Sequence, residues 1–318
     1  MAVAGRGDAA KLGCGIDVGA NTVRLLIAEV RDGRISKPIY SGREITRLGA
    51  GIGKTGKLSP KGAAKTLKLF GSFKEAMDRY QVGHIFAAAT SAVREADDAA
   101  EFVSKANSLG IPLVVISGDE EAKYMRMGVL SGVSEAKKDT LIYDIGGGSV
   151  EIVFTGQSKL PFVRSVPVGV VKLAEIYNFR QRASLKTLYD CSAYINHLLK
   201  PAFDELSAFL GGRFSGVPIG VAGTVTSVAA VDMEMDIYNP EAVNSHILTE
   251  ERLERIKVKL SEISAKERLS IKGVERGRED ILVPGALIIA EILRLLGCGR
   301  SAVSDNGLRE GLTIASVA

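Results

Sequence analysis

Two stretches of the chain share one pattern, in which an apolar run, a glycine-containing turn and a second apolar run follow one another. Residues 13–36 contain the first, GCGIDVGANTVRLLIAEVRDGRIS, and residues 139–156 contain the second, DTLIYDIGGGSVEIVFTG. Short apolar runs rich in β-branched residues and separated by such turns predict β-hairpins, and Asp32-Gly33 predicts one more hairpin turn. We therefore expect the same strand–turn–strand unit twice.

Apolar residues at helical spacing alternate with further short apolar runs along the rest of the chain. Helices are predicted over residues 59–80, 95–110, 118–133, 185–206, 249–263 and 283–297. A strand running into a turn is predicted over 84–92, a buried strand over 111–117, and a strand, a Gly-Thr turn and a helix over 217–231. Strands mixed with helices in this way indicate the α/β class.

Length, charge and composition limit the number of domains and the classes of partner, but they do not identify a function. A length of 318 residues suggests two domains. A net charge of +4 is compatible with a polyanionic ligand but is no signature of nucleic-acid binding. No run approaches the roughly 20 apolar residues of a membrane helix, and we interpret residues 1–11 as a frayed tail. We expect neither a nucleic acid nor a membrane as partner.

Three scattered cysteines, Cys14, Cys191 and Cys298, fit a reducing cytoplasm better than a disulfide framework or a zinc site. A dinucleotide-binding loop is disfavoured as well. Such a loop opens a helix, whereas the glycines near residue 15 lead into the β-branched and apolar run TVRLLIAEV.

The repeated glycine-containing turn suggests a site that binds an anion. A glycine-rich turn between strands directs several backbone N–H groups the same way and forms a nest for anions, where glycine permits close approach and, if needed, positive φ. The leading aspartate would repel a phosphate unless a cation or water lay between them, and Mg²⁺ bridges carboxylate and phosphate oxygens. The aligned positions are Asp17 with Asp144, Gly19 with Gly146, Thr22 with Ser149 and, with opposite charge, Arg24 with Glu151.

Six segments resemble, in order and spacing, the exopolyphosphatase / guanosine pentaphosphate phosphatase family. They are GIDVGANTVRLLIAEV, AAATSAVREA, ISGDEEAKYMRMGV, IYDIGGGSVEIV, GVAGTVTSVAAV and VSDNGLREGL. That family belongs to the superfold of actin, the sugar kinases and the Hsp70 ATPase. The match runs from about residue 13 to the C-terminus and looks like the short, two-domain form, without the additional C-terminal helical domains of the longest members.

The resemblance implies an α/β fold of two actin-like (ribonuclease H-like) domains with an active cleft between them. We place the first domain at 12–127 and the second at 128–303, and we expect residues 304–318 to return to the first. Hinge motion about the junction is expected.

The reaction that the resemblance implies is hydrolysis of a terminal phosphoanhydride by water, which needs a base, charge neutralisation and positioning. Glu121 matches the family's catalytic base. Its neighbour Glu120 is the alternative, although Ser117-x-x-Glu120 also fits a capping box and both carboxylates suit a helix N-terminus. Asp144, Glu151 and Asp17 are the expected Mg²⁺ contacts, direct or through water; otherwise they are turn or solvent-facing residues.

The expected phosphate-binding residues belong to the two turns, a third turn and two arginines. They are Gly19, Asn21, Thr22, Arg24, Arg94, Gly146, Gly147, Gly148, Ser149, Gly223 and Thr224. Arginine offers a planar fork for phosphoryl oxygens, and a helix N-terminus binds anions. Surface ion pairing for the arginines and a plain tight turn for Gly223 and Thr224 are the alternatives. Residues 251–280 are interpreted as a solvated face, with Arg268, Lys272, Arg276 and Arg278 as a candidate polyphosphate track.

The expected function is a cytoplasmic, Mg²⁺-dependent exopolyphosphatase that releases orthophosphate from the end of inorganic polyphosphate. The alternatives are a guanosine pentaphosphate 5′-phosphohydrolase, a non-catalytic sensor that binds an alarmone or nucleotide, and an actin-like kinase. The substrate partner is inorganic polyphosphate or guanosine pentaphosphate, and a homodimer is the candidate assembly.

Overall fold

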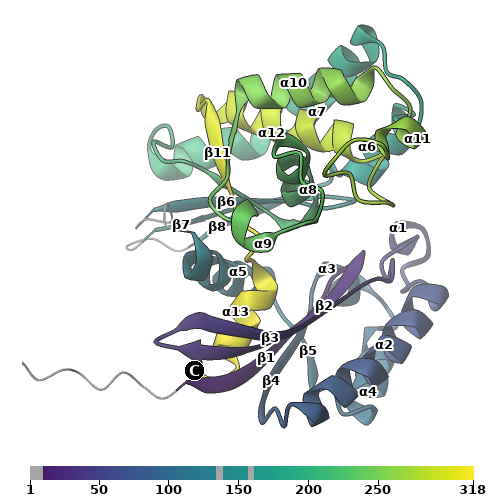
Figure 1. Ribbon diagram of the computed structural model, residues 1–318, viewed down its shortest axis with the longest axis vertical. Helices are drawn as coiled ribbons and strands as arrows, with labels where there is room; N and C mark the ends of the chain where they lie inside the picture. The colour runs from purple at the N-terminus through teal and green to yellow at the C-terminus, as the bar shows by residue number, and fades with distance from the viewer. Residues whose placement is uncertain (1–9, 134–138, 157–160) are drawn as a thin grey trace, which may run out of the picture. The chain divides into compact units, whose positions relative to one another are not determined.

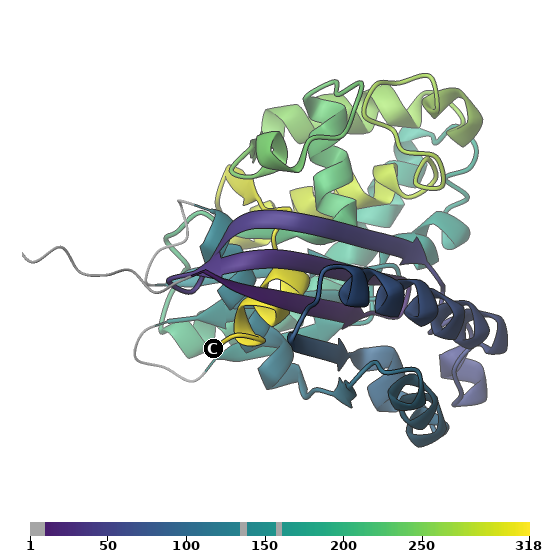
Figure 2. The same cartoon turned by 60° about the horizontal axis from the view of Figure 1, so that its bottom comes forward.

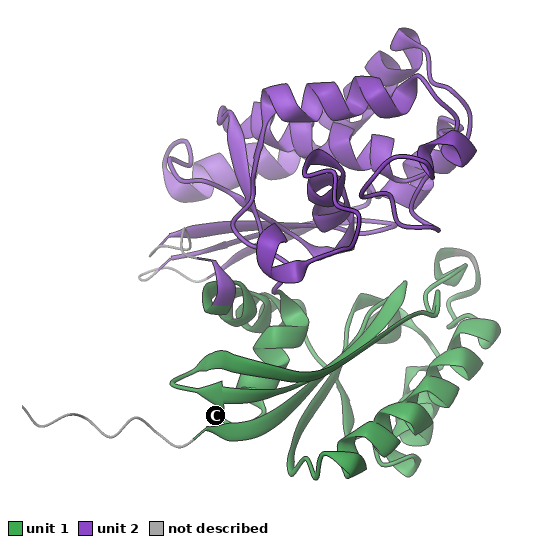
Figure 3. Ribbon diagram, in the orientation of Figure 1, with its two compact units in different colours: residues 1–131, 307–318 green, residues 132–306 purple. Residues whose placement is uncertain are grey.

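A computed structural model of the chain describes residues 10–133, 139–156 and 161–318. Most of the expected N-terminal tail, residues 1–9, lies outside the described part. The chain divides into two compact units, residues 1–131 with 307–318 and residues 132–306 (Figure 3). The structural boundaries thus fall after residues 131 and 306, against the 127 and 303 expected from the sequence.

Unit 1 is built on a five-stranded sheet whose order is β3-β2-β1-β4-β5 (Figure 1). Strands β1 to β3 form an antiparallel meander, and β4 and β5 add to β1 in parallel. Asp32 and Gly33 both have positive φ, as a tight hairpin turn requires, so the predicted turn is confirmed. The strands are β1 Lys11–Val18, β2 Thr22–Arg31, β3 Arg34–Ile45, β4 His84–Ala89 and β5 Leu113–Val115.

The two faces of this sheet carry different helices. One face packs its apolar residues against the buried Phe70 and Phe73 of α2 and Phe102 of α4. The other face receives α13, which lies along β1 and β2 (Figure 2). The helices of unit 1 are α1 Ile52–Thr55, α2 Pro60–Arg79, α3 Ser91–Glu95, α4 Ala99–Ser108, α5 Gly118–Gly132, whose last residue belongs to unit 2, and α13 Leu308–Ala315.

Glycines let α13 approach this face closely. A Cβ on Gly15 would lie 2.5 Å from the carbonyl oxygen of Arg309, and one on Gly13 would lie 2.6 Å from the hydroxyl of Ser316. On the other side of α13, a Cβ on Gly311 would lie 1.7 Å from the carbonyl oxygen of Tyr124 in α5. The C-terminal helix is therefore fixed between β1 and α5 by contacts that tolerate no side chain at these positions.

The prediction of a buried strand over 111–117 is wrong in its burial. Strand β5 keeps Leu113 buried, but Val114 and Val115 are 47% and 40% exposed. β5 is the edge strand of the sheet, so only one side of it has a neighbour.

Unit 2 repeats the sheet of unit 1 and extends it. Its order is β8-β7-β6-β9-β11, followed by β10, and β9 and β11 are parallel to β6 just as β4 and β5 are parallel to β1. The predicted second hairpin is β6 with β7, so the internal duplication extends from the turn to the whole sheet. The strands are β6 Thr140–Ile145, β7 Val150–Thr155, β8 Phe162–Val166, β9 Ile219–Val221, β10 Ile247–Thr249 and β11 Arg300–Val303.

The helices of unit 2 enclose a core dominated by α12, which is buried along most of its length. The sequence predicted α7, α8, α10 and α12, whereas α6 and strands β8 and β11 were missed. The helices are α6 Val170–Ile176, α7 Leu185–Leu210, α8 Ala222–Asp232, α9 Pro240–Val243, α10 Glu250–Ser261, α11 Ala265–Arg268 and α12 Leu282–Leu296.

Two global features bear on the sequence interpretation. The three cysteines are free thiols. Among the described residues, none of the helices combines the length and apolar character that a membrane crossing needs.

Candidate active site

The turns of the two hairpins are closed by the same hydrogen bond. The amide of Gly19 donates to the carbonyl of Thr22 at 3.1 Å, and the amide of Gly146 donates to the carbonyl of Ser149 at 2.9 Å. The match between the two sequences is therefore also a match in backbone geometry.

In unit 2, the start of α6 fixes the triple-glycine turn. The amide of Val170 donates to the carbonyl of Gly146 at 3.1 Å, and that of Val171 donates to the carbonyl of Gly147 at 3.0 Å. In a planar trans peptide the C=O and the following N–H point in opposite directions. The N–H groups of Gly147 and Gly148 must therefore point away from α6, which is the arrangement expected of an anion-binding nest.

In unit 1, the chain after β3 takes the place of α6. The amide of Gly49 donates to the carbonyl of Ala20 at 2.8 Å, and the amides of Thr46 and Arg47 donate to the carbonyl of Asn21 at 3.0 Å. By the same peptide geometry, the N–H groups of Asn21 and the residue after it point away from that segment.

Positive φ, which glycine would permit, is not used in these turns. None of Gly19, Gly146, Gly147 and Gly148 is among the glycines with positive φ. The close approach is instead made by Gly169, just before α6, because a Cβ there would lie 2.4 Å from the carbonyl oxygen of Gly147. Gly169 was missed because the contact joins segments far apart in the sequence.

The charged position that distinguishes the two turns lies opposite the leading aspartate in each hairpin. Asp17 pairs in register with Arg24 in unit 1. Burial raises the pKa of Asp17 to about 6, although Arg24 and Arg309 act in the opposite direction. Asp17 and Arg24 thus form a cross-strand pair of opposite charge, a stabilising arrangement in a sheet.

The corresponding pair in unit 2, Asp144 and Glu151, has like charges. Hydroxyls surround Glu151, since Ser149 donates to its Oε1 at 2.6 Å and Ser165 donates to the same atom at 2.8 Å. Residues opposite each other in register project from the same face of the sheet, so a single cation could contact both carboxylates.

These two carboxylates fit the chemistry of Mg²⁺. No group of three or more His, Cys, Asp or Glu that could hold a metal occurs within residues 10–133, 139–156 and 161–318. Mg²⁺ is commonly held by one or two carboxylates, with water and substrate phosphate completing its shell. The Asp144–Glu151 pair matches that pattern, whereas a complete protein cage would not be required.

The predicted base and one predicted cation come together in unit 1. Arg94, in the last turn of α3, donates from Nη1 to Oε2 of Glu121 at 3.3 Å. The same nitrogen donates to the carbonyl of Ile116 at 2.8 Å, which fixes the guanidinium at the end of β5. The side chain of Glu121 is 19% exposed, so the carboxylate is held and still reaches solvent.

Glu120 has a different partner. Its Oε2 accepts hydrogen bonds from the amide and the hydroxyl of Ser117, both at 2.9 Å, while its own amide donates to the Ser117 hydroxyl at 3.2 Å. The predicted capping box is thus confirmed. Because hydrogen bonds from the Ser117 backbone and side chain stabilise the ionised form, the pKa of Glu120 is lowered.

The third predicted turn is part of a helix. Helix α8 begins at Ala222, which itself has a φ of 66°, so Gly223 and Thr224 lie in its first turn. The side chain of Thr224 is buried, and its methyl group would lie 2.7 Å from a Cβ on Gly285. A Cβ on Gly223 would lie 2.5 Å from Nη1 of Arg278, so glycine leaves room there for a guanidinium.

The candidate polyphosphate track over 268–278 is wrong for its first member. Arg268 is fully buried and donates to the carbonyls of Leu260, Phe179, Glu279 and Ile263. It joins the end of α10 to the chain at Phe179 and at Glu279. Two further members form ion pairs, Lys272 with Asp236 at 3.0 Å and Arg278 with Glu275 at 2.9 Å.

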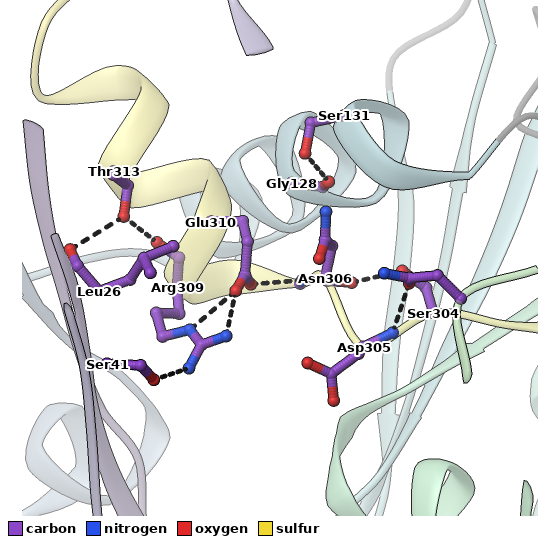
Figure 4. A network of polar contacts seen from close by, with 12 residues as sticks. Leu26, Ser41, Gly128, Ser131, Ser304, Asp305, Asn306, Arg309, Glu310 and Thr313 are labelled. Atoms are coloured by element: carbon purple, nitrogen blue, oxygen red, sulfur yellow. Dashed lines mark hydrogen bonds and ion pairs between the residues drawn. The ribbon is translucent and has the colours of Figure 1, made fainter. Parts of the chain in front are cut away.

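The C-terminal helix contributes charged residues that were missed. Arg309 donates from Nε to Oε1 of Glu310 at 2.8 Å and from Nη1 to the hydroxyl of Ser41 on β3 at 3.0 Å (Figure 4). Glu310 also accepts from the amide of Gly307 at 2.8 Å and so caps the helix. The only signal in the sequence was the NGLREGL segment, which carried the resemblance without an assigned role.

Known proteins match this chain over most of its length. The model of the "Ppx/GppA phosphatase family" matches residues 26–318. The chain is 30% identical to a bifunctional 3-dehydroquinate synthase/phosphatase of Fusobacterium nucleatum, over 95% of this chain but only 46% of that protein. It is 27% identical to Exopolyphosphatase 2 of Mycobacterium tuberculosis, over 94% of this chain and 97% of that protein.

Solved structures agree with these matches. The Aquifex aeolicus member of the Ppx/GppA family superposes with a TM-score of 0.83 at 27% identity, covering 97% of this chain and 98% of that one. An exopolyphosphatase from Cytophaga hutchinsonii gives 0.79 at 25% identity, covering 93% and 94%. The predicted fold class, α/β with two actin-like domains, is confirmed. The chain belongs to the Ppx/GppA phosphatase family and is a hydrolase of phosphoanhydride bonds.

Proposed function

We propose that this protein is a Mg²⁺-dependent exopolyphosphatase, which hydrolyses the terminal phosphoanhydride of inorganic polyphosphate and releases orthophosphate. The observation that carries the proposal is the Arg94–Glu121 pair, a carboxylate and a guanidinium held together at the start of α5. Support for the substrate comes from the similarity to Exopolyphosphatase 2, which extends over nearly the whole of both proteins.

Glu121 is assigned the role of general base. A general base must reach the proton of the attacking water, and the carboxylate of Glu121 is ordered by Arg94 yet partly exposed. Glu120 is a poorer choice because it is engaged in the capping box, and its lowered pKa reduces its tendency to take up a proton. Arg94 and Arg24 are assigned to phosphoryl oxygens, for which the arginine fork is suited.

The two turns supply backbone donors for the phosphoryl groups. The N–H groups that follow the bonded carbonyls of Ala20, Asn21, Gly146 and Gly147 are held in fixed directions, so no reorganisation is needed when an anion binds. When bound, Mg²⁺ would supply charge neutralisation at the phosphate oxygens. Asp144 and Glu151 would hold it, and the hydroxyls of Ser149 and Ser165 orient Glu151 for that task.

Phosphate release tests the proposal. The purified protein should release orthophosphate from polyphosphate with Mg²⁺ present, and chelation of the metal should abolish the release. Guanosine pentaphosphate and ATP are assayed in parallel because both end in a phosphoanhydride. Release from guanosine pentaphosphate alone would replace the proposed substrate, binding without turnover would indicate a sensor, and ADP formed only with an acceptor would indicate a kinase.

A further inference from the structure

The solvent-exposed side of α2 begins with a row of lysines. Lys61, Lys65 and Lys68 are all exposed and follow one another at spacings of four and three residues, so they lie on one stripe of the helix. The stripe points away from the buried side of α2, which carries Phe70 and Phe73. At 1.5 Å per residue, Lys61 and Lys68 are about 10 Å apart along the helix axis.

Two members of this row differ from the other lysines of α2 in having no acidic partner. Lys74 pairs with an acidic residue four positions further along the helix. Lys65, the middle member of the row, pairs with Glu44 of β3 at 2.5 Å. Among the residues that the structure describes, neither Lys61 nor Lys68 forms an ion pair. Two charges of the row are therefore available to an external anion.

The position of Lys61 is unfavourable for the helix itself. A helix N-terminus carries a partial positive charge and favours acidic residues. The first turn of α2 contains no acidic residue, and Lys61 follows directly after Pro60, behind the cap formed by Ser59. The stability of the helix therefore does not explain this lysine, and the helix dipole adds to the positive potential of the row.

An exposed arginine connects the row to the β1–β2 turn. The amide of Arg47 donates to the carbonyl of Asn21 in that turn at 3.0 Å, and a Cβ on Gly62 of α2 would lie 2.8 Å from the carbonyl oxygen of Arg47. Arg47 has a φ of 54°, a left-handed conformation that glycine adopts readily and arginine does not. The chain thus keeps an exposed cation between the turn and α2 at a position where glycine would relieve strain.

We propose that Arg47, Lys61 and Lys68 form a track that binds the distal phosphoryl groups of a long polyphosphate chain whose end is bound at the β1–β2 turn. This inference rests on the proposed function and places a preference for long chains in unit 1. The contacts run without interruption from the turn through Arg47 to the first turn of α2. Lysines about 10 Å apart suit successive charges of a linear polyanion, which releases counterions when it is neutralised in this way.

Calorimetric titration in a chelator, so that no turnover occurs, compares tripolyphosphate with a polyphosphate long enough to extend from the turn beyond Lys68. The double variant Lys61→Gln/Lys68→Gln should raise the dissociation constant for the long chain about tenfold, because two charge-assisted contacts are lost. Its dissociation constant for tripolyphosphate should change by less than about twofold. The matched control, Lys74→Gln/Lys105→Gln, removes two lysine charges elsewhere in unit 1 and should change both constants by less than about twofold.

Arg47→Gly separates binding from folding. Glycine accepts the left-handed backbone, so this variant should melt no lower than wild type and still bind the long chain about threefold or more weakly. Gln81→Gly is its control, because Gln81 has a φ of 53° just beyond the other end of α2 and carries no charge. That variant should also melt no lower than wild type, and it should keep the wild-type affinity for the long chain.

Unchanged binding of the long chain by Lys61→Gln/Lys68→Gln would overturn the track, and so would an equal loss for tripolyphosphate or in the control variant. A single-stranded oligonucleotide with the same number of phosphates is titrated as well. If it bound as tightly as polyphosphate and lost affinity in the same variant, the surface would be one for nucleic acid instead. Because titration needs no hydrolysis, the track is decided separately from the phosphate-release assay that tests the proposed function.

Discussion

The β1–β2 and β6–β7 hairpins have the same turn and opposite electrostatics. Each leads with an aspartate, closes with one amide-to-carbonyl bond and has its turn carbonyls bound by a second segment. They differ in the residue opposite that aspartate, which is Arg24 in one hairpin and Glu151 in the other. The bonding of the turn carbonyls is thus common to both units, and we propose that the opposed side chain decides whether a hairpin offers donors to an anion or attracts a cation.

The supporting segments differ as well. In unit 2 the turn carbonyls meet the N-terminus of α6, and in unit 1 they meet an irregular segment after β3. Replacing a helix by an irregular segment preserves the turn because only the direction of two or three N–H donors matters. An anion-binding turn of this kind therefore needs its carbonyls to be bonded from one side, and either a helix N-terminus or an irregular segment can supply those bonds.

The largest expected effect comes from a residue outside both hairpins. If the hairpins bind phosphate and metal, neither needs to supply the base. Glu121→Gln should lower turnover by roughly 10²–10⁴-fold, the usual cost of losing a general base, and should leave the circular dichroism spectrum unchanged.

Glu120→Gln is the matched control for the Glu121 variant. It should retain turnover and most of its thermal stability, because the amide oxygen of glutamine can still accept the capping hydrogen bonds from Ser117. The opposite pattern, with Glu121→Gln active and Glu120→Gln inactive, would move the base by one residue.

The next effect tests the support of the β6–β7 turn. Gly169→Ala places a Cβ within 2.4 Å of the Gly147 carbonyl oxygen, and overpacking of this kind typically costs about 1–3 kcal/mol. Urea unfolding should show that loss, and phosphate affinity should fall with it.

Gly148→Ala is the control for the turn, since a Cβ at that position meets nothing within 4 Å. It should leave the stability of the protein close to that of wild type. Equal stability of the Gly169 and Gly148 variants would show that the contact with α6 does not hold the turn.

Much of this comparison could be predicted from the sequence, because hairpins and nests are local. The alternation of apolar residues, the Asp32-Gly33 turn and the glycine runs placed both hairpins correctly. Arg309 and Gly169 were missed because each acts through a contact with a segment distant in sequence. The exposure of Val114 could not be predicted, since an apolar run does not reveal whether its strand lies at an edge.

The smallest effect concerns Asp17, the half-buried aspartate of the first hairpin. Since burial raises the folded-state pKa of Asp17 to about 6, above its ordinary value near 3.9, the folded protein holds a proton between these values that the unfolded chain releases. Stability therefore decreases as pH rises through this window. With Mg²⁺ removed by a chelator, Asp17→Asn should raise the melting temperature at pH 8 by about 2–4 °C relative to wild type. This gain should disappear below pH ~4.

A melting temperature of Asp17→Asn that is unchanged or lower at pH 8 would show that Arg24 and Arg309 fully offset the cost of burying this carboxylate. The two hairpins would then differ less in electrostatics than their sequences imply.

The Mg²⁺ requirement of two single variants tests the division of labour between the hairpins most directly. Glu151→Gln should raise the Mg²⁺ concentration for half-maximal phosphate release about tenfold or more, and excess Mg²⁺ should restore part of the rate. The guanidinium of Arg24 has only hydrogen-bond donors and cannot be a metal ligand. Arg24→Gln should therefore keep the wild-type Mg²⁺ requirement and instead raise the KM for polyphosphate. An unchanged Mg²⁺ requirement in Glu151→Gln, or equal rescue of both variants by Mg²⁺, would contradict the account.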